Sequence, residues 1–288
     1  MASHILNLFA FLIVLFFFLI LVMLITKSVP VIRKNSIAEL IFSSKWDTDA
    51  KQFGFFPAII GTLEVTLLSM LFAIPVSMLT AIYISEYASS SIKTSISAFI
   101  DVLSGIPSVV FGLCALLYLV PAVSMVMKKI FSIQTTGMCV ITASLTLSVM
   151  TLPVIISLIV ESLQLVPKEL REVSLSLGAT KWQSVKKILF RAAGPGIISA
   201  ILLGFGRAFG ETMAVAMIIG SKNKIPVSVF SAGETLPSLI VNSFGEMMSV
   251  PLQQSALIFV ALILFIIVMV TNSVAKMINI RLSQKWRY

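Results

Sequence analysis

Charged residues and histidine are scarce in this chain, and common catalytic motifs are missing from it. Charged residues make up 11% of the 288 residues, and His4 is the single histidine. A single histidine cannot supply the paired histidine ligands of a metal site. It also leaves little material for acid–base catalysis by histidine. The sequence also contains no Gly-x4-Gly-Lys-Ser/Thr loop and no His-Glu-x-x-His pair, which bind nucleotide phosphates and zinc respectively. We therefore expect a chain that is not an enzyme, cannot itself hydrolyse ATP, and carries no metal or cofactor.

Cysteine is rare as well, and regular alternation of polar and apolar residues is absent. Cys114 and Cys139 both fall within apolar stretches, where we expect them to pack as small apolar side chains and not to form a disulfide. No segment shows the two-residue alternation of a membrane-spanning β-strand. These absences argue against a disulfide framework and against a β-barrel.

Long apolar runs are abundant instead. Hydrophobic residues make up 58% of the chain, and the mean hydropathy is +1.06. A helix needs about 20 apolar residues to cross a bilayer. Six blocks approach or exceed that length: Ile5–Ile25, Phe56–Ile84, Ile96–Val120, Gly137–Ile159, Gly196–Gly220 and Pro251–Val274. The sequence thus predicts an all-α membrane protein with six transmembrane helices. The first block is longer than a signal-peptide core and no cleavage site follows it, so we expect it to be retained.

Six spans place both termini on the same side of the membrane. If the N-terminus lies inside, the inner segments carry slightly more Lys and Arg than the outer segments. Because positive residues favour the cytoplasmic side, we expect both termini to be cytoplasmic. The net charge of +9 is spread over both faces and favours contact with membrane lipid or an anionic solute. Because no basic stripe is interleaved with aromatic residues, we expect no nucleic-acid partner.

Two long connections on the outer side contain short helical segments. Residues 26–55 are mixed and polar, with room for one short helix at Ser36–Ser43. Residues 221–250 contain an apolar piece, Leu236–Phe244, that is too short to span a bilayer. We therefore expect an outer loop with some structure and a second segment that caps the outer face.

A third connection, residues 166–196, shows helix start and stop signals. Pro167 stands where a first-turn proline is tolerated, and Gly178 ends the first helix. A second helix starts at once, because Thr180 and Gln183 have the spacing of a capping box. The pattern predicts a helix, a glycine bend and another helix. Two interpretations remain open: an amphipathic loop on the lipid headgroups, or a helix presented to the groove of a soluble partner.

The same connection resembles a known element. The segment "ELREVSLSLGATKWQSVKKILF" is similar to the cytoplasmic coupling loop of ABC-transporter permeases, with Glu172, Gly178 and Ile188 at the recurring positions. It departs from the family pattern at Val173 and Ser174, where two alanines recur, and at the Phe-Arg that stands in place of Leu-Pro after Leu189. The resemblance implies a coupling loop at 164–195, with functional residues Glu169, Glu172, Gly178, Ala179, Thr180 and Ile188.

Further segments narrow the resemblance to the phosphate-specific transport permeases of the PstC type. They are "SSKWDTDAKQFGFFPAIIGTLEVT", "ISEYA", "GIPSVVFG" and "GRAFGETMAV", and they extend over residues 43–215. The resemblance implies the type I permease fold of ABC importers with a cytoplasmic coupling helix. Residues 1–55 would form the first transmembrane helix and the outer loop, and residues 56–288 the permease domain.

The resemblance also implies a function. The chain would form half of the translocation pathway of an ATP-driven phosphate importer in the bacterial plasma (inner) membrane. It would pair with a PstA-type permease, dock a dimer of ATP-binding subunits that use ATP and Mg, and receive phosphate from a binding protein. Two alternatives remain: a permease for another oxyanion such as sulfate, molybdate or phosphonate, and a self-sufficient secondary transporter. The latter should show internal repeats and needs no docking helix.

Two charges stand in the middle of the fifth predicted span. Arg207 lies about 16 Å from Gly196 along a helix, near the bilayer centre, and Glu211 follows four residues later on the same face. A charge at that depth costs at least about 2.5 kcal/mol, so it should face protein or water. Either the two form a private ion pair that fixes helix packing, or they line the substrate pathway. In the second case the guanidinium binds phosphate, while Glu211 tempers the attraction and disfavours sulfate, which has no proton to donate.

Small residues accompany these charges. Gly206 and Gly210 have the spacing that lets two helices approach closely, either within the chain or toward a second permease. Ser104 and Ser108 flank Pro107 and are candidates for the lining of a polar pathway, although serines in membrane helices often bond to backbone carbonyls. We assign the glycines to helix packing and the serines to the substrate pathway.

Prolines and acids within other spans are the remaining features. Pro75, Pro107 and Pro153 each remove a backbone hydrogen bond, and we expect structural kinks at them in preference to hinges for alternating access. Glu64 is predicted near the outer end of the second span and Asp101 near the inner end of the third, where carboxylates can reach the headgroups. We assign neither acid to a ligand site.

Overall fold

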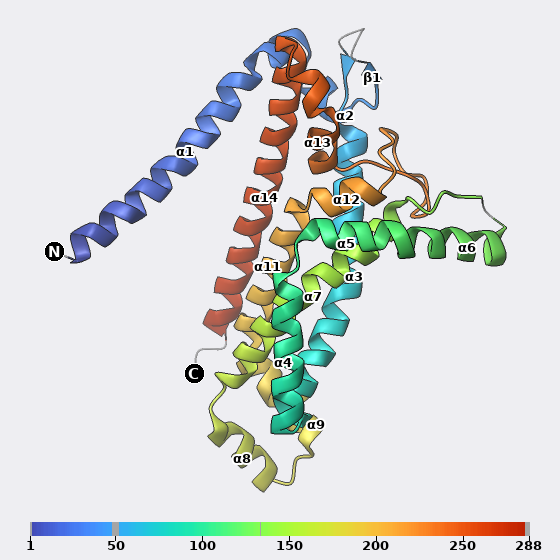
Figure 1. Cartoon of the computed structure of the whole chain (residues 1–288). Helices are drawn as coiled ribbons and strands as arrows, with labels where there is room; N and C mark the ends of the chain where they lie inside the picture. Colours follow the sequence, from blue (N-terminus) through green and yellow to red (C-terminus); the bar gives the residue numbers. More distant parts are fainter. Residues whose placement is uncertain (1, 48–51, 133, 286–288) are drawn as a thin grey trace.

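Helices make up most of the computed structural model, which describes residues 2–47, 52–132 and 134–285. The α-helices are α1 (Ala2–Lys34), α2 (Ile37–Phe42), α3 (Phe56–Ile82), α4 (Ser90–Gly105), α5 (Ser108–Cys114), α6 (Val120–Phe131), α7 (Val140–Gln164), α8 (Lys168–Ser176), α9 (Lys181–Ser184), α10 (Phe190–Ala192), α11 (Gly194–Gly210), α12 (Met213–Ile218), α13 (Leu236–Met247) and α14 (Pro251–Lys285). Three π-helical turns continue α3, α5 and α9: η1 (Tyr83–Tyr87), η2 (Ala115–Leu119) and η3 (Val185–Leu189). Figure 1 shows α8 and α9 at one end of the molecule and α13 at the other.

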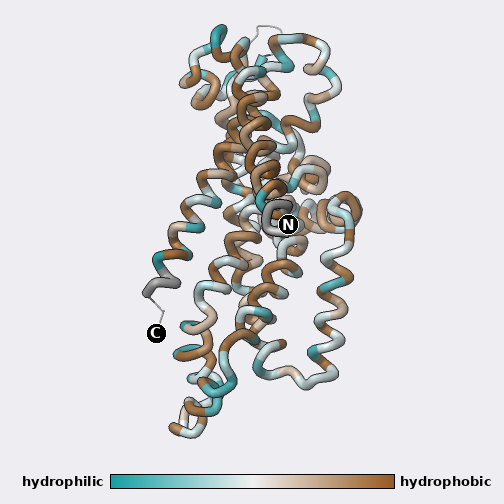
Figure 2. Tube along the Cα trace, turned by 90° about the vertical axis from the view of Figure 1, so that its left-hand side faces the viewer, coloured by the Kyte–Doolittle hydropathy of each residue, from teal (hydrophilic) through white to brown (hydrophobic). Residues whose placement is uncertain are grey.

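Five helices are long and apolar enough to cross a membrane. They are Leu6–Lys34, Phe56–Tyr87, Ser108–Ile130, Val140–Gln164 and Pro251–Arg281. A sixth candidate is the pair Lys181–Ala192 and Gly194–Gly210, which is bent by 74°. Figure 2 shows hydrophobic residues along the long helices and hydrophilic residues toward both ends of the molecule. The predicted helical protein with several membrane spans is confirmed, and the count is six if the bent pair is one span.

The third predicted span, Ile96–Val120, is wrong as a single helix. α4 begins earlier, at Ser90, and ends at Gly105, while α5 begins at Ser108. Proline disfavours the helical conformation of the residue before it, and Ile106, which precedes Pro107, has an extended backbone with ψ 127°. Figure 1 shows α5 and α6 running crosswise to α3 and α7. Pro107 therefore separates two helices and does not kink one.

The earlier start of α4 also changes the position of one acid. Asp101 lies in the second half of α4, and not near the beginning of a helix as predicted. Its side chain is exposed. Glu64 lies in the first third of α3, where it is half-buried. Pro75 and Pro153 lie inside α3 and α7, as predicted.

The first helix continues past its predicted end at Ile25 to Lys34, although it contains Pro30. A proline inside a helix disrupts the hydrogen bonding around it. Here the Ser255 hydroxyl of α14 accepts a hydrogen bond from the Val31 amide at 3.1 Å and donates one to the Lys27 carbonyl at 2.9 Å. Ser255 thus supplies hydrogen bonds beside Pro30, where the helix backbone lacks one of its own.

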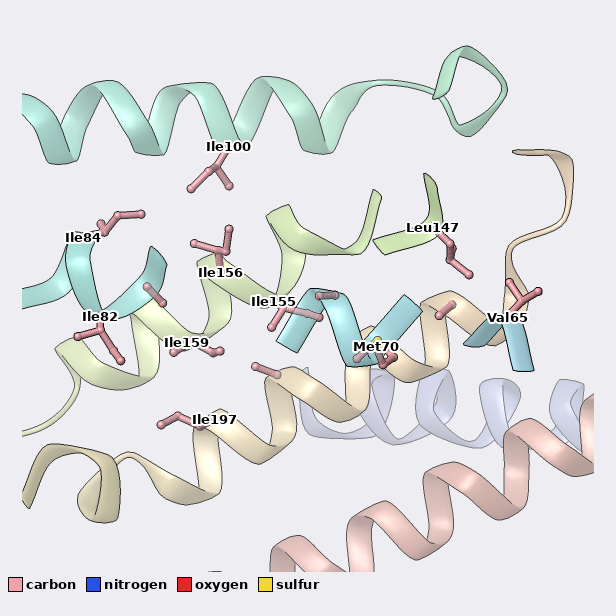
Figure 3. Packing of buried hydrophobic residues seen from close by; sticks show 14 of the residues in the cluster. Val65, Met70, Ile82, Ile84, Ile100, Leu147, Ile155, Ile156, Ile159 and Ile197 are labelled. Carbon is pink, nitrogen blue, oxygen red and sulfur yellow. The ribbon is translucent and has the colours of Figure 1, made fainter. Parts of the chain in front are cut away.

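The main core forms around α7. Figure 3 shows Ile156 of α7 facing Ile100 of α4, and Ile159 lying between Ile82 of α3 and Ile197 of α11. These side chains are almost fully buried. Because α7 contacts α3, α4 and α11, it is the helix against which the membrane-spanning elements are assembled.

Short hydroxyl side chains of α3 and α7 bond to the backbone of their own helices. Each donates a hydrogen bond to a carbonyl three or four residues earlier, so its hydroxyl proton needs no acceptor on another helix. Small side chains also let two helices approach closely. The residues are Thr62, Ser69, Ser144, Thr146, Ser148 and Thr151.

A second cluster covers the end of the molecule opposite α8. A two-stranded hairpin, β1 (Trp46–Asp47) and β2 (Gln52–Phe53), pairs Trp46 with Phe53. The Trp46 ring lies 5.8 Å from the ring of the fully buried Phe55, which lies 5.9 Å from Phe259 of α14. The hairpin therefore fastens the first outer connection to α14. The two short helices predicted in the outer connections are confirmed as α2 and α13.

Candidate functional site

The fifth predicted span is interrupted at the two charges it carries. α11 ends at Gly210 and α12 begins at Met213, with Glu211 in an extended conformation at ψ 124°. The prediction that Arg207 and Glu211 share one face of a continuous helix is therefore wrong. The physical reason is local: the Glu211 carboxylate accepts a hydrogen bond from the Ala214 amide at 3.2 Å, so it caps a new helix start.

Arg207 occupies the last turn of α11 and its side chain is exposed in the single chain. It lies about 20 Å along the helix axis from Gly194, at 1.5 Å per residue. Within the part of the chain that the structure describes, Arg207 has no ion-pair partner, so the structure does not show the private ion pair with Glu211. Its cation stands at the end of α11 where the helix dipole is negative.

The break itself presents polar backbone. The Thr212 hydroxyl donates to the Gly210 carbonyl at 3.0 Å, and Glu211 occupies the positive start of α12. Irregular backbone at membrane depth occurs where it is buried in protein or lines a water-filled path. Transporters commonly build solute sites from such interrupted helices. Arg207, Glu211 and this backbone can therefore form a polar patch suited to an anion.

The structure brings the other interrupted segment to the same region. Ser104 is exposed near the end of α4, and the half-buried Ser108 is the first residue of α5. α5 packs on α12, and a Cβ added at Gly112 would lie 2.9 Å from the Ala214 Cα. The two short helices that follow the two breaks thus contact each other directly.

The glycines next to Arg207 are loosely surrounded in the single chain. A Cβ at Gly206 would meet the Asn272 side chain of α14 at 3.6 Å, an ordinary contact, and one at Gly210 would meet nothing within 4 Å. The close approach of α11 to α7 depends on two other glycines. A Cβ added at Gly204 would lie 2.6 Å from the Ile155 side chain, and one added at Gly196 would lie 2.3 Å from the Ser162 hydroxyl. Sequence reasoning did not identify this pair.

The predicted helix, bend and helix are present at residues 168–184. α8 ends before Gly178, which has φ +81°, a conformation that glycine adopts without steric cost. Thr180 and Gln183 form the predicted capping box at the start of α9. The Ser174 and Ser184 hydroxyls lie 2.6 Å apart and join the two arms. These local signals were sufficient to predict the element.

The remaining loop residues divide into an exposed set and a packed set. Glu169 and Glu172 are exposed on α8, whereas Ala179 and Ile188 are half-buried. A row of apolar side chains on α8 also faces solvent in the single chain. Exposed fractions are 42% for Leu170 and 55% for Val173 of α8, and 82% for Leu177, which directly follows α8. Three- and four-residue spacing places such side chains on one helix face, which can enter a partner's groove.

Comparison with known proteins identifies the family. The chain matches the family model described as binding-protein-dependent transport system inner membrane component over residues 73–284. It belongs to this family. It is similar to the phosphate transport system permease protein PstC of Xylella fastidiosa strain Temecula1, with 33% identity over 85% of this chain and 79% of that protein. Similarity to the probable PstC of Methanocaldococcus jannaschii is 30% identity over 96% of this chain and 91% of that protein.

A solved structure shares the permease's fold. A chain of the MetNI methionine ABC transporter in an inward-facing conformation matches with a TM-score of 0.60 at 20% identity. The match covers 78% of this permease and 94% of that chain. The predicted type I importer permease fold is therefore confirmed, and the multi-pass membrane protein is a transport component.

One ion pair of the permease was not predicted. Arg171 of α8 donates to the Glu86 carboxylate of η1, with an Nη2–Oε1 distance of 3.1 Å. Glu86 belongs to the "ISEYA" segment that we associated with the family only as a pattern. A contact across 85 positions leaves no local signature, so only the presence of an acid in that segment hinted at it.

A buried carboxyl lies at the opposite end of the permease. Glu234 precedes α13, is 5% exposed and accepts a hydrogen bond from Asn242 at 3.4 Å. Burial raises the pKa of Glu234 to about 7, and the bond from Asn242 opposes that shift. Its backbone is packed so tightly on α3 that a Cβ at Gly61 would lie 2.1 Å from the Glu234 carbonyl. This carboxyl therefore changes charge near neutral pH.

Proposed function

We propose that the chain is a permease subunit of an ATP-driven importer of inorganic phosphate and forms half of the translocation pathway. The observation that carries the proposal is Arg207, an exposed cation at the end of an interrupted span with no carboxylate partner among the described residues. The similarity to proteins named phosphate transport permeases supports the choice of anion.

The chemistry of the guanidinium suits a passing phosphate. Arginine stays protonated and offers several donors in a planar fork that matches two oxygens of a tetrahedral oxyanion. One feature reduces the attraction enough for release: the Glu211 carboxylate lies just beyond the break. A binding site in a pathway must hold its solute only briefly.

Glu211 gives the site a means to discriminate. Its carboxylate can accept a hydrogen bond from a phosphate that still carries a proton, whereas sulfate has none to donate at neutral pH. One Glu211 oxygen already accepts from Ala214, which orients the side chain at the break. The carboxylate therefore repels a fully deprotonated dianion and tolerates a protonated one.

Exposed surfaces of the chain are compatible with the partners that we propose. The exposed Arg207, Ser104 and Gly210 would face a second, PstA-type permease across the pathway. The apolar side chains of α8 would enter a groove of one ATP-binding subunit of a dimer, where ATP is hydrolysed. A phosphate-binding protein would deliver solute at the α13 end. We place the complex in the bacterial plasma (inner) membrane, in contact with membrane lipid and with both termini cytoplasmic.

The test is ATP-dependent phosphate uptake by proteoliposomes that contain the full set of candidate subunits. The wild-type complex should accumulate phosphate, and Arg207→Ala should lower uptake at least tenfold while the subunits still copurify. Arg281→Ala removes an exposed cation of α14 away from the break and should leave uptake unchanged. Wild-type uptake by an assembled Arg207→Ala complex would refute the role of this cation. Transport of sulfate or molybdate in place of phosphate would refute the substrate.

A further inference from the structure

The coupling loop is tied to the end of α3 by an ion pair that is largely shielded from solvent. Arg171 donates from Nε at 3.3 Å and from Nη2 at 3.1 Å to the same Glu86 oxygen, and the side-chain exposures are 21% and 9%. The Ser85 hydroxyl donates to that oxygen at 3.0 Å. The pair borders a cavity of about 530 Å³ that Lys93 and Lys168 also line.

The same guanidinium also binds the end of α7. Its Nη1 donates to the Val166 carbonyl at 2.8 Å and its Nη2 to the Leu163 carbonyl at 2.6 Å. Carbonyls at a helix C-terminus lack intrahelical partners and carry partial negative charge. Arg171 therefore joins α8, η1 and the end of α7 at one point, which a lysine ammonium with its single nitrogen cannot do in the same geometry.

The second arm of the coupling loop contacts the same π-helical turn. The Lys181 ammonium of α9 lies 5.0 Å from the centroid of the Tyr87 ring, within the range of a cation–π interaction. The paired hydroxyls of Ser174 and Ser184 hold α8 and α9 together. Both arms of the loop thus contact η1, the five-residue turn that directly follows α3.

The helices held by Arg171 are those that support the candidate pathway. α11, which carries Arg207, packs on α7 through Gly204 against Ile155 and through Gly196 against Ser162. Movement of α7 must therefore displace α11, because protein interiors are too closely packed to absorb it. A continuous set of contacts runs from α8 through Arg171 to α7 and on to α11.

We propose that Arg171 is a positioning residue that latches the coupling loop to the ends of α3 and α7. Through this latch, force applied to α8 by an ATP-binding partner reaches the helices around Arg207. This inference rests on the proposed function for the identity of the partner. It concerns coupling, not solute binding: without the latch, α8 remains docked while α3 and α7 no longer follow it.

The experiment compares ATP hydrolysis with phosphate uptake in proteoliposomes of the complete complex. Arg171→Ala should keep the rate of ATP hydrolysis within about twofold of wild type, yet lower the phosphate moved per ATP at least tenfold. Glu86→Ala should have the same direction of effect, and the double variant should be no worse than Arg171→Ala alone. Arg171→Lys should restore only part of the coupling. Lys93→Ala, which removes another cation from the same cavity, should match wild type.

A second readout needs no solute. Hydrogen exchange of the α8 and α9 backbone amides in the complex should be at least tenfold faster in Arg171→Ala than in wild type or Lys93→Ala. Wild-type exchange together with wild-type phosphate per ATP in Arg171→Ala would overturn the latch. If the wild-type complex moves no phosphate, the proposed function fails. The exchange measurement still tests the latch in that case, because equal exchange in Arg171→Ala and wild type would overturn it.

Discussion

Arg207 and Glu211 lie on opposite sides of a helix break: Arg207 ends α11, and Glu211 caps α12 through the Ala214 amide at 3.2 Å. Arg207→Lys keeps the charge but loses the planar fork. Since a charged hydrogen bond contributes about 1.5 kcal/mol, we expect phosphate uptake to fall about tenfold. Uptake by the reconstituted complex, with Arg281→Lys as a matched control, measures the effect. An unchanged rate would show that charge alone serves the solute.

Glu211→Gln separates the charge of this residue from its capping role. The amide oxygen can still accept from the Ala214 amide, so α12 should keep its start, whereas repulsion of a dianion is lost. We expect sulfate to inhibit phosphate uptake about tenfold more strongly than in wild type. Glu211→Ala should in addition lower the melting temperature, because a lost cap costs about 1 kcal/mol. Equal inhibition by sulfate in Glu211→Gln and in wild type would exclude a role of the Glu211 charge in discrimination between sulfate and phosphate.

Gly178→Ala tests the bend of the coupling loop without introducing a clash. A Cβ there would meet nothing within 4 Å, but the backbone has φ +81°, which costs an alanine about 1 to 2 kcal/mol. We expect amide exchange in α8 and α9 to accelerate about tenfold. Gly105→Ala is the control, because its surroundings are equally open and it lies at the end of α4 with an ordinary φ. Equal protection in both variants would show that the bend relaxes freely.

Glu234 should make the stability of the end of the molecule opposite α8 sensitive to pH. Its folded pKa of about 7 lies above the ordinary value of 4.5, so the folded state binds the proton more tightly than the unfolded state. The contribution of Glu234 to stability is therefore fully present below about pH 4.5, falls as pH rises to 7, and levels off above 7, with a total loss of about 3 kcal/mol. Thermal unfolding of purified protein between pH 5 and pH 8 should show a decline of several degrees.

Glu234→Gln should remove that decline, because the amide stays neutral and can still accept from Asn242. Glu246→Gln is the matched control, since Glu246 is an exposed acid near the other end of α13, and it should behave as wild type. A pH-dependent melting temperature that persists in Glu234→Gln would assign the effect to another group.

Local signals predicted local structure. The proline before α8, the glycine after it and the capping box of Thr180 with Gln183 act within a few residues, and each was read correctly. The family resemblance was equally accessible, because its motifs are short and contiguous. Helix ends that depend on distant residues were not predictable in this way. The first helix continues through Pro30, where the Val31 amide donates to the hydroxyl of Ser255, 224 positions away.

The break at the candidate site has a local cause that a spacing of four does not reveal. An unbroken helix through Glu211 is the natural prediction from spacing of four, and the break appears because the carboxylate turns to cap α12, which is packed on α5. The latch of Arg171 requires Glu86, 85 positions away. Charge and spacing can therefore nominate residues for a site, while the contacts that orient them come from helix packing across the chain.

The segment ending in α10 meets α11 at 74°, and this angle sets how motion passes between them. A push along the first segment has only a small component along the axis of α11 and a large one across it. Under the proposed coupling, we expect α11 to tilt about the end near α10 in preference to sliding along its axis. The end that carries Arg207 is farthest from the corner, so we expect it to move farther than any other part of α11 when the coupling loop is displaced.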